Sequence, residues 1–438
     1  MGLVMRRRCG SLVVAGAVVA AVVAAVGLGG AAPVAAAPVS SEAGVVSAGV
    51  PQQMRALWVD AWEPGLFSGA EVSSLVATAK QMGVNTLVVQ TVRRSDCLCN
   101  KSILPRAAGT GAAQFDPLAD VVAKGHAAGL QVHAWVVVGK MWSGASAPSD
   151  PRHVFNVHGP GTKDSWSDRR YDGTVSADGT TFLDLGNPAA RKHVVATVDS
   201  IQKNYAIDGV NLDYIRYPDQ TASGRLDNDW GYTPVALAAF RRTFKTTGTP
   251  APGDPLWHRF RRDQVTAVVR GVHDQMMRRD KRDRLSVNAI AFGQGPGAST
   301  NWTRTDGFRQ TVQDIPRWTH QKIVDSVFVM NYRSASDATQ RRYFTSWVQG
   351  MAALQKRDGR TMVSGNAMWN NTIAQSIAQY QEAARAGVGW AGYAYSTMTI
   401  PDPQVGVSAQ RALVAGTFGN GPFRVKAAVP SMPWKKLK

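Results

Sequence analysis

The sequence predicts a single-domain α/β fold, a (β/α)8 barrel, from three observations. Short apolar segments, eight in number, alternate with helical patterns over about 350 residues, which is the strand count of this fold. The connections after the third, fourth and fifth segments are long, at 139–187, 216–235 and 293–320, whereas those leading into the segments are short. The first segment is not followed by the glycine-rich phosphate loop typical of a doubly wound open sheet, which is the alternative fold.

Strands and helices alternate from residue 54 to residue 425, and 426–438 form a C-terminal tail. The predicted strands cover 55–61, 85–91, 130–138, 208–215, 284–292, 323–332, 361–368 and 389–396. The clearest helical windows are 68–83, 116–129, 187–204 and 372–387. The first window begins at the capping residue Ser68 and ends at Gly83, as a helix of this length should.

The first residues of the chain are expected to direct export. Arg6, Arg7 and Arg8 precede an apolar run, and the small residues Val34 and Ala36 suit a cleavage site after them. The alternative is a membrane anchor, but the run is rich in alanine and glycine. We therefore expect a signal peptide at 1–36, a small, polar linker at 37–53, and a secreted, soluble protein.

The net charge of +18 favours anionic partners. Removal of the three signal-peptide arginines leaves 18 − 3 = +15. Acidic cell-wall polymers, membrane surfaces and nucleic acid all suit such a charge. Because the basic residues are scattered and the chain is predicted to be exported, we expect no nucleic-acid partner and a peripheral association with an anionic cell wall. The oligomeric state is left open.

Cys97 and Cys99 form a CxC pair in the mature chain. Exported proteins keep disulfides, but a ring this small is strained, so a disulfide and two free thiols both remain open. Two cysteines without a neighbouring histidine make a poor zinc site. The sequence shows no cluster of histidines and carboxylates at metal-binding spacing, so we expect neither a metal nor a cofactor.

Aromatic residues gather in the long loops after the third, fourth and fifth predicted strands. In a barrel, these loops form the mouth above the carboxyl ends of the strands. Aromatic faces stack on sugar rings, while neighbouring polar groups bind the hydroxyls. We expect at least one sugar platform among Trp142, Trp166, Tyr171, Trp230 and Trp302.

The segment DGVNLDYIRYP, at 208–218, places a carboxylate at the end of the fourth strand. Alternation turns Asp213 to the inner rim of the barrel and Tyr214 toward the helices. Asp213 is then either a catalytic carboxylate or one half of a bridge with Arg216 that closes the strand. Asp208, at the start of the strand, is expected to form a turn or a hydrogen bond.

Glycoside hydrolysis generally needs a second carboxyl group near the first. The chain has only four glutamates, and three of them lie in the linker or in helices. The leading candidates are therefore Asp60, after the first strand, and Asp96, after the second. Glu63 and Asp306 are further alternatives.

Other polar and aromatic side chains are predicted to lie at the rim and to bind the substrate. They are Gln90, Arg93, His133, Trp135, Arg216, Tyr217, Asn331, Tyr332 and Tyr395. A histidine that points into a barrel is often a satisfied core residue, so His133 is either that or a base.

The chain resembles the bacterial glycosyl hydrolase-like family ten, a group of exported barrel proteins. The resemblance rests on WVDAWEPG, VVQTVRRSDCLCNKSILPR, GLQVHAW, FLDLGNPAAR, DGVNLDYIRYP and VFVMNY, and it continues to GPFRVKAAVPSMPW. It implies glycosidase activity on peptidoglycan strands stripped of their peptides, with Asp213 in the site. Two departures lie in the mouth loops: Glu63 stands where histidine is more usual, and CLC at 97–99 stands where DAYY-like residues are usual.

Together, these observations predict an exported glycoside hydrolase that acts on cell-wall glycan. Asp213 is the expected general acid, and Asp60 or Asp96 the second catalytic group. The competing hypothesis is a barrel that binds glycan without cutting it, which the scarcity of glutamate at the rim favours. Transglycosylation or lyase chemistry at the same site would differ in its products.

Overall fold

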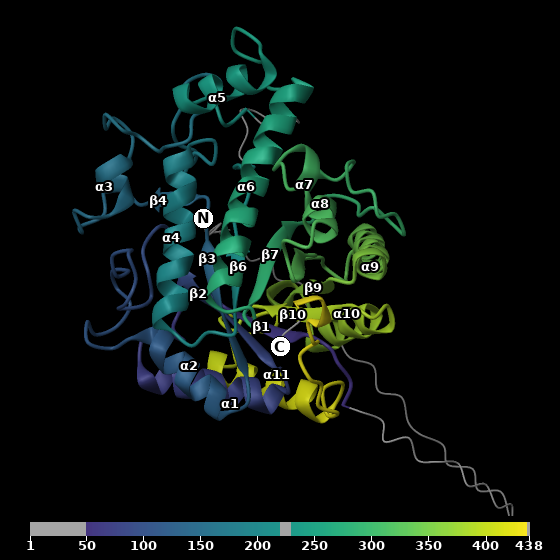
Figure 1. Ribbon diagram of the computed structural model, residues 1–438. Helices are drawn as coiled ribbons and strands as arrows, with labels where there is room; N and C mark the ends of the chain where they lie inside the picture. Colours follow the sequence, from purple (N-terminus) through teal and green to yellow (C-terminus); the bar gives the residue numbers. More distant parts are fainter. Residues whose placement is uncertain (1–49, 220–228, 436–438) are drawn as a thin grey trace, which may run out of the picture. The chain divides into compact units, whose positions relative to one another are not determined.

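The computed structural model describes residues 50–219 and 229–435. Within these residues, eight parallel strands close into a barrel in the order β1-β10-β9-β8-β7-β6-β3-β2 (Figure 1). They are β1 (Arg55–Val59), β2 (Thr86–Val92), β3 (Gln131–Val137), β6 (Gly209–Asp213), β7 (Arg284–Ile290), β8 (Ser326–Met330), β9 (Thr361–Ala367) and β10 (Gly389–Tyr393). Each lies within a predicted strand or overlaps one closely, so the (β/α)8 prediction is confirmed.

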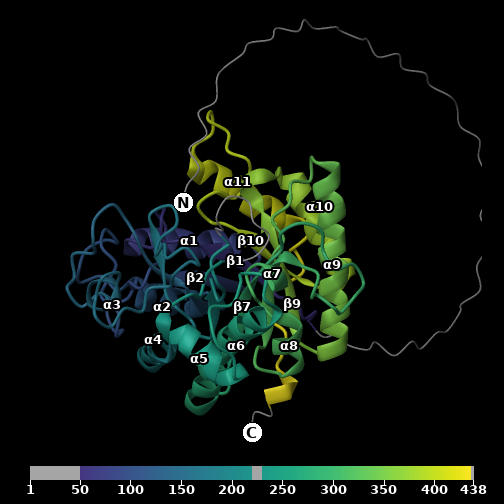
Figure 2. The same cartoon turned by 90° about the horizontal axis from the view of Figure 1, so that it is seen from above.

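Helices surround the strands, as the view in Figure 2 shows. The longer ones are α1 (Gly69–Met82), α2 (Pro117–Ala127), α4 (Pro188–Asn204), α5 (Pro234–Phe244), α6 (Pro255–Arg279), α9 (Ala338–Asp358), α10 (Ile373–Arg385) and α11 (Val407–Asn420). The predicted boundaries of α1 are confirmed, because the Ser68 side chain accepts a hydrogen bond from the Glu71 backbone N–H and Gly83 ends the helix at φ 81°. The shorter elements are α3 (Val154–His158), α7 (Asp306–Arg309), α8 (Ile315–His320), η2 (Met368–Asn370) and η3 (Pro433–Lys435).

Alternation along the strands separates two apolar layers. Val210 and Leu212 belong to the outer layer, which the helices cover. Trp58, Phe328 and Val363 belong to the inner layer, which fills the barrel. Polar side chains on the inner face must therefore find partners within the barrel or lie at one of its two ends.

The amino-terminal end of the barrel, here called the floor, is covered by both ends of the described chain. The Gln53 N–H donates to the Ala428 carbonyl at 3.0 Å. Farther along the tail, the Lys435 ammonium pairs with Asp325 at 2.7 Å. Residues 50–53 of the predicted linker and 426–435 of the predicted tail therefore pack on the barrel. The predicted signal peptide lies outside the described residues, and none of the described helices has the length and apolarity to span a bilayer.

The long loop after β3 carries a two-stranded antiparallel sheet that the sequence analysis did not predict. It consists of β4 (Lys140–Ser143) and β5 (Thr180–Phe182). Two buried carboxyl groups, one between β4 and β5 and one just after β5, hold the loop against the segment that follows β6. Asp168 Oδ1 accepts from the Gly231 N–H at 2.9 Å, and Asp184 Oδ2 accepts from the Thr233 hydroxyl at 2.5 Å. We call these two residues the acid clamp.

The structure tests the predictions made for the cysteine pair, for two loop tryptophans and for Asp208. Cys97 and Cys99 form a disulfide, and both are buried. Trp230 and Trp302, two of the five residues among which at least one sugar platform was expected, are buried in the outer apolar layer and pack loops onto the barrel, so neither is a platform. Asp208 accepts hydrogen bonds from the Val132 N–H, as its predicted role requires.

The acid clamp should make stability depend on pH. Burial raises the pKa of Asp184 to about 6, whereas an Asp in an unfolded chain titrates near 3.8. Because the folded-state pKa is the higher one, this carboxyl favours folding fully below about pH 4, and that contribution is lost as the pH rises through about 6. The free energy of unfolding of wild type, relative to that of Asp184→Asn, should fall by up to about 3 kcal/mol from pH 4 to pH 7.

Urea unfolding at four pH values between 4 and 7 measures this difference. Asp178→Asn is the matched control, because Asp178 is an exposed aspartate of the same loop. Its pH dependence should run parallel to that of wild type. An Asp184→Asn curve that is also parallel to wild type would contradict the assignment.

Candidate active site

Asp213 is the last residue of β6, and its carboxylate points into the mouth of the barrel. The Trp135 indole N–H, on the neighbouring β3, donates to Asp213 Oδ2 at 3.0 Å. The backbone N–H of Tyr214 donates to Oδ1 at 2.8 Å. The predicted inner-rim positions of Asp213 and Trp135 are therefore confirmed. A carboxylate with two neutral donors keeps lone pairs available for a ligand.

The alternative bridge between Asp213 and Arg216 is replaced by another pair. The Arg216 guanidinium lies 2.9 Å from Asp219 Oδ1, and it stacks on the Tyr214 ring at 4.2 Å. The prediction that Tyr214 faces the helices holds only in part, because the residue packs against both the outer and the inner apolar layers. Its φ of 47° is left-handed, which ends the strand alternation and leaves the ring at the mouth.

Asp60 follows β1 and is held by short contacts. The Ser396 hydroxyl donates to Asp60 Oδ2 at 2.5 Å, and the Trp62 N–H donates to Oδ1 at 3.2 Å. Gln90, a predicted rim residue, accepts from the Ala61 N–H at 2.9 Å and so fixes the backbone beside Asp60. Gln90 is buried, and it acts on the segment that carries the carboxylate.

Tyr393 connects the two carboxylates. It ends β10, which pairs with β1, and its ring lies 6.2 Å from that of Trp135, the hydrogen-bond partner of Asp213. Burial raises the pKa of the Tyr393 phenol, and the negative charges of Asp60 and Asp213 both raise it further. The Tyr393 ring therefore lies between the segments that carry the two carboxylates, with Trp135 and Asp213 on one side and the end of β1, before Asp60, on the other. Sequence reasoning chose Tyr395 on this strand and missed Tyr393.

An aromatic wall surrounds these carboxylates. The Tyr332 ring lies 6.1 Å from Trp58, 5.2 Å from Tyr393 and 5.2 Å from Trp369. Trp369, on η2 after β9, is 39% exposed and was not predicted. Burial, followed by the charges of Tyr393 and Asp213, raises the pKa of Tyr332, whose predicted position at the mouth is confirmed. Both phenols therefore stay protonated and can donate hydrogen bonds at neutral pH.

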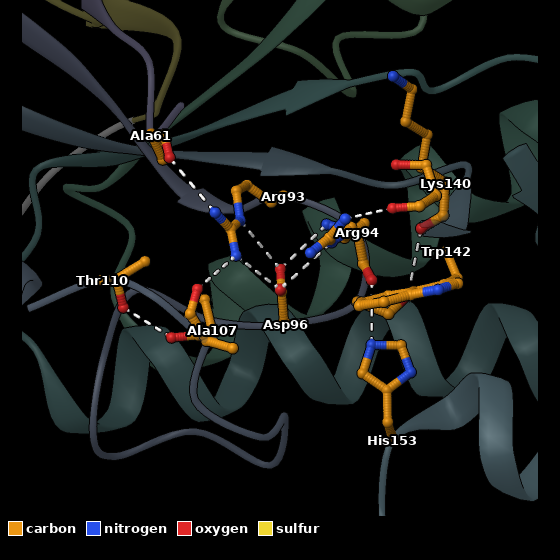
Figure 3. A network of polar contacts seen from close by, with 12 residues as sticks. Ala61, Arg93, Arg94, Asp96, Ala107, Thr110, Lys140, Trp142 and His153 are labelled. Atoms are coloured by element: carbon orange, nitrogen blue, oxygen red, sulfur yellow. Dashed lines mark hydrogen bonds and ion pairs between the residues drawn. The ribbon is translucent and has the colours of Figure 1, made fainter. Parts of the chain in front are cut away.

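Asp96 belongs to a network of ion pairs in the loop after β2 (Figure 3). Its carboxylate lies 3.0 Å from Arg93 Nη2 and 3.6 Å from Arg94 Nε, and it is buried. Arg93, a predicted rim residue, also donates to the Ala61 carbonyl at 3.4 Å. Asp96 thus has two cationic partners. Through Arg93, it also helps to hold the loop that carries Asp60.

A row of aromatic and cationic groups lies above this network. The Arg94 guanidinium is 3.9 Å from the Trp142 ring and 5.5 Å from the Trp62 ring. Arg93 lies over Trp62 at 4.8 Å. Trp62 is 49% exposed, so its outer face is open to a sugar ring. Of the predicted aromatic platforms, Trp142 is the one that this row places beside the mouth; Trp62 was missed.

Two predicted rim residues lie elsewhere on the barrel strands. His133 pairs with Gly209, the first residue of β6, and burial followed by the charge of Arg284 lowers its pKa to about 3. It is a core residue near the floor. The Asn331 amide donates to the Phe344 carbonyl of α9 at 3.2 Å, so this side chain points outward. The rim positions predicted for His133 and Asn331 are wrong.

Tyr217 and Tyr395 are also absent from the mouth. Tyr217 is buried beneath the loops, and its ring lies 5.9 Å from the Arg261 guanidinium. Burial raises the pKa of the Tyr217 phenol, and the negative charges of the acid clamp raise it further. Tyr395 is buried in the outer apolar layer, where the Arg411 guanidinium stacks on its ring at 3.9 Å. Strand β10 ends at Tyr393, three residues before the predicted end, so the alternation used for Tyr395 no longer holds.

Asn288 on β7 is a further inward-facing residue. Its register places it level with Asp213, because Val287 pairs with Leu212. The side chain is buried, and its Oδ1 has no hydrogen-bond partner among the residues that the structure describes. A buried amide oxygen without a donor is suited to a ligand N–H or O–H. The described part of the chain contains no group of three or more possible metal ligands.

A closed parallel barrel with two carboxylates and an aromatic wall at the carboxyl ends of its strands defines the class of glycoside hydrolase barrels. Residues 53–378 match the family model described as Glycosyl hydrolase-like 10. The chain belongs to this family.

One curated protein resembles part of the chain. Glycosyl hydrolase YngK of Bacillus subtilis (strain 168) is 24% identical over 178 residues, which are 39% of this chain and 32% of the relative. The match thus spans about a third of that protein's length.

Two solved structures share the fold. The PgaB (BpsB) glycoside hydrolase domain from Bordetella bronchiseptica is 16% identical, with a TM-score of 0.55 over 80% of this chain and 100% of that one. The catalytic domain of β-amylase from Paenibacillus polymyxa is 11% identical, with a TM-score of 0.59 over 85% and 99%.

Asp96→Asn tests whether Asp96 supports the loop. The substitution leaves two arginines without their counter-charge in a buried network, so the free energy of unfolding should fall by roughly 3 kcal/mol. Asp150→Asn is the control, because Asp150 pairs with the exposed Arg152 and should change stability little. Urea denaturation measures both variants. Equal stability of the two would show that the network does not hold the loop.

Proposed function

We propose that the protein is an exported hydrolase of bacterial cell-wall glycan, which cleaves glycosidic bonds in peptidoglycan strands stripped of their peptides. The observation that carries the proposal is the geometry of the mouth: Trp135 donates to Asp213 and lies 6.2 Å from the ring of Tyr393, which ends the strand paired with β1, the strand that Asp60 follows. Membership of the Glycosyl hydrolase-like 10 family and the predicted signal peptide support it. The high positive charge would keep the protein near an anionic wall.

Asp213 acts as the general acid and Asp60 as the second carboxylate. The acid protonates the oxygen of the leaving sugar, while the other group attacks the anomeric carbon or activates a water. The separation of the two carboxylates determines which of these occurs and hence whether the anomeric configuration is retained. Asp60 is preferred to Asp96 because two arginines already pair with Asp96.

Tyr393 and Tyr332 supply neutral hydrogen-bond donors at the reacting centre. Their raised pKa values keep both phenols uncharged, so they add no negative charge beside the carboxylates. A phenol near both carboxylates helps to position them and the sugar between them. The buried amide oxygen of Asn288, which has no donor among the described residues, is suited to an N-acetyl N–H or a hydroxyl of the same sugar.

The exposed tryptophans hold the neighbouring sugars. Trp62 and Trp369 follow β1 and β9, which lie on either side of β10 in the barrel. Their rings offer apolar faces to sugar rings on the two sides of the cleaved bond. The guanidinium groups of Arg93 and Arg94 restrain the Trp62 ring through cation–π contacts.

Activity on purified, peptide-free glycan strands tests the proposal. Wild type should generate new reducing ends, whereas Asp213→Asn and Asp60→Asn should lower kcat by about 100-fold to 10,000-fold. Asp96→Asn, assayed where it is folded, should retain most of the activity. Wild-type protein that binds the strands without releasing products would support the non-catalytic binding barrel instead, and anhydro ends would indicate lyase chemistry.

Tyr393→Phe tests the residue that joins the two carboxylates. Loss of its hydroxyl should lower kcat by roughly 10-fold to 100-fold with a smaller change in KM, since the donor acts at the reacting centre. Tyr395→Phe is the matched control, because Tyr395 lies in the outer layer and should leave both constants unchanged. Steady-state kinetics of the two variants decides the assignment, and equal losses would remove Tyr393 from the site.

A further inference from the structure

A lysine side chain lies over the aromatic ring of Tyr214, the residue that follows the proposed general acid. Lys140 begins β4, and its ammonium is 4.5 Å from the centre of the Tyr214 ring. Tyr214 follows Asp213 directly, and its left-handed backbone keeps the ring at the mouth. In Figure 3, the Lys140 side chain extends away from the ion-pair network around Asp96. Its charge therefore lies on the Tyr214 ring, next to Asp213 in the chain, rather than within the ion-pair network.

The other cations of this part of the mouth have acidic partners. Asp96 pairs with Arg93 and Arg94, and Asp219 pairs with Arg216. These arginines also donate to backbone carbonyls or stack on rings. Within the residues that the structure describes, the Lys140 ammonium has no ion pair, and the Tyr214 ring is its neighbour.

An ammonium on an aromatic face keeps its hydrogen-bond donors for a ligand. The ring quadrupole stabilises the charge of Lys140 without occupying a carboxylate or a carbonyl oxygen. The three N–H donors are strong partners for an anionic oxygen. A positive charge at this place also disfavours sugars that carry free amino groups, because like charges repel.

We propose that Lys140 selects glycans that carry a free carboxylate on a sugar next to the cleaved bond. This inference rests on the proposed function. In a peptide-free peptidoglycan strand, every second sugar bears a lactyl group with a free carboxylate. When a peptide is attached, that group is an amide and has lost its charge. Lys140 would thus be the residue by which the site distinguishes stripped strands from substituted ones.

A pair of substrates isolates this interaction. The first is a set of peptide-free strands, and the second is the same strands with their lactyl carboxylates converted to methyl amides. Wild type should prefer the carboxylate form by on the order of tenfold or more in kcat/KM, as expected for a charge-assisted hydrogen bond. Lys140→Met keeps the apolar stem on Tyr214 and should abolish the preference. Lys140→Arg should restore most of it.

Lys356→Met controls for the loss of one positive charge. Lys356 is exposed near the carboxyl-terminal end of α9, and its removal should leave the preference at the wild-type value. A preference that survives in Lys140→Met would overturn the inference. So would an equal loss of kcat/KM on both substrates, since that would indicate a structural role.

Binding separates this inference from the proposed function. Asp213→Asn and the double variant Asp213→Asn, Lys140→Met are titrated with both kinds of strand by calorimetry. Tighter binding of the carboxylate form by the first but not the second would support the role of Lys140, even if wild type released no products. Equal affinities of the single variant for both forms would overturn that role, whatever the activity of wild type.

Discussion

Closure of the sheet is the constraint on which the rest of the structure depends. Once β1 pairs with β10, the barrel strands have neighbours on both sides, and side chains must point either to the helices or into a narrow interior. The interior is filled by groups such as Trp58 and Phe328, so an inward polar side chain meets solvent only at an end. Closure therefore sends Asp213 and Tyr393 to one place, although they are far apart in sequence.

Ion pairs and hydrogen bonds between the loops hold the mouth together, in addition to the apolar packing of the loops on the barrel. Asp96 joins Arg93 and Arg94, and through Arg93 it reaches the backbone beside Asp60. The acid clamp fastens the loop after β3 to the segment after β6. Carboxylates thus have two uses in this protein. Asp96, Asp168 and Asp184 brace the loops, whereas Asp60 and Asp213, which are also largely buried, lie at the mouth.

Sequence reasoning predicted what depends on local pattern and strand order. The eight strands and the inward position of Asp213 follow from alternation and count, and the structure confirms both. The predicted side-chain directions fail where the strand alternation ends, or where a contact with a distant segment sets the direction. Tyr214 leaves the alternation through a left-handed backbone. Asn331 turns outward because α9 offers it a carbonyl, a contact that no spacing in its own segment reveals.

The same limits explain the corrected site. Tyr395 and Tyr393 look equivalent in the sequence, since both are inward positions of a strand that alternation continues through residue 396. The strand stops at Tyr393, and the residues after it pack toward Arg411 of α11. Asp96 and Asp60 likewise look equivalent as acids after adjacent strands. Which of them is neutralised depends on the arginines that the loop folds around it.

The floor of the barrel has a consequence for how the protein can be tethered. The described chain enters at residue 50 beside Ala428 and leaves at Lys435 beside Asp325, so both points of attachment lie at the end opposite the mouth. Both points are separated from Asp60 and Asp213 by the length of the barrel strands. Immobilisation through the chain ends, on a resin or on a cell surface, should therefore present an open mouth to long polymers.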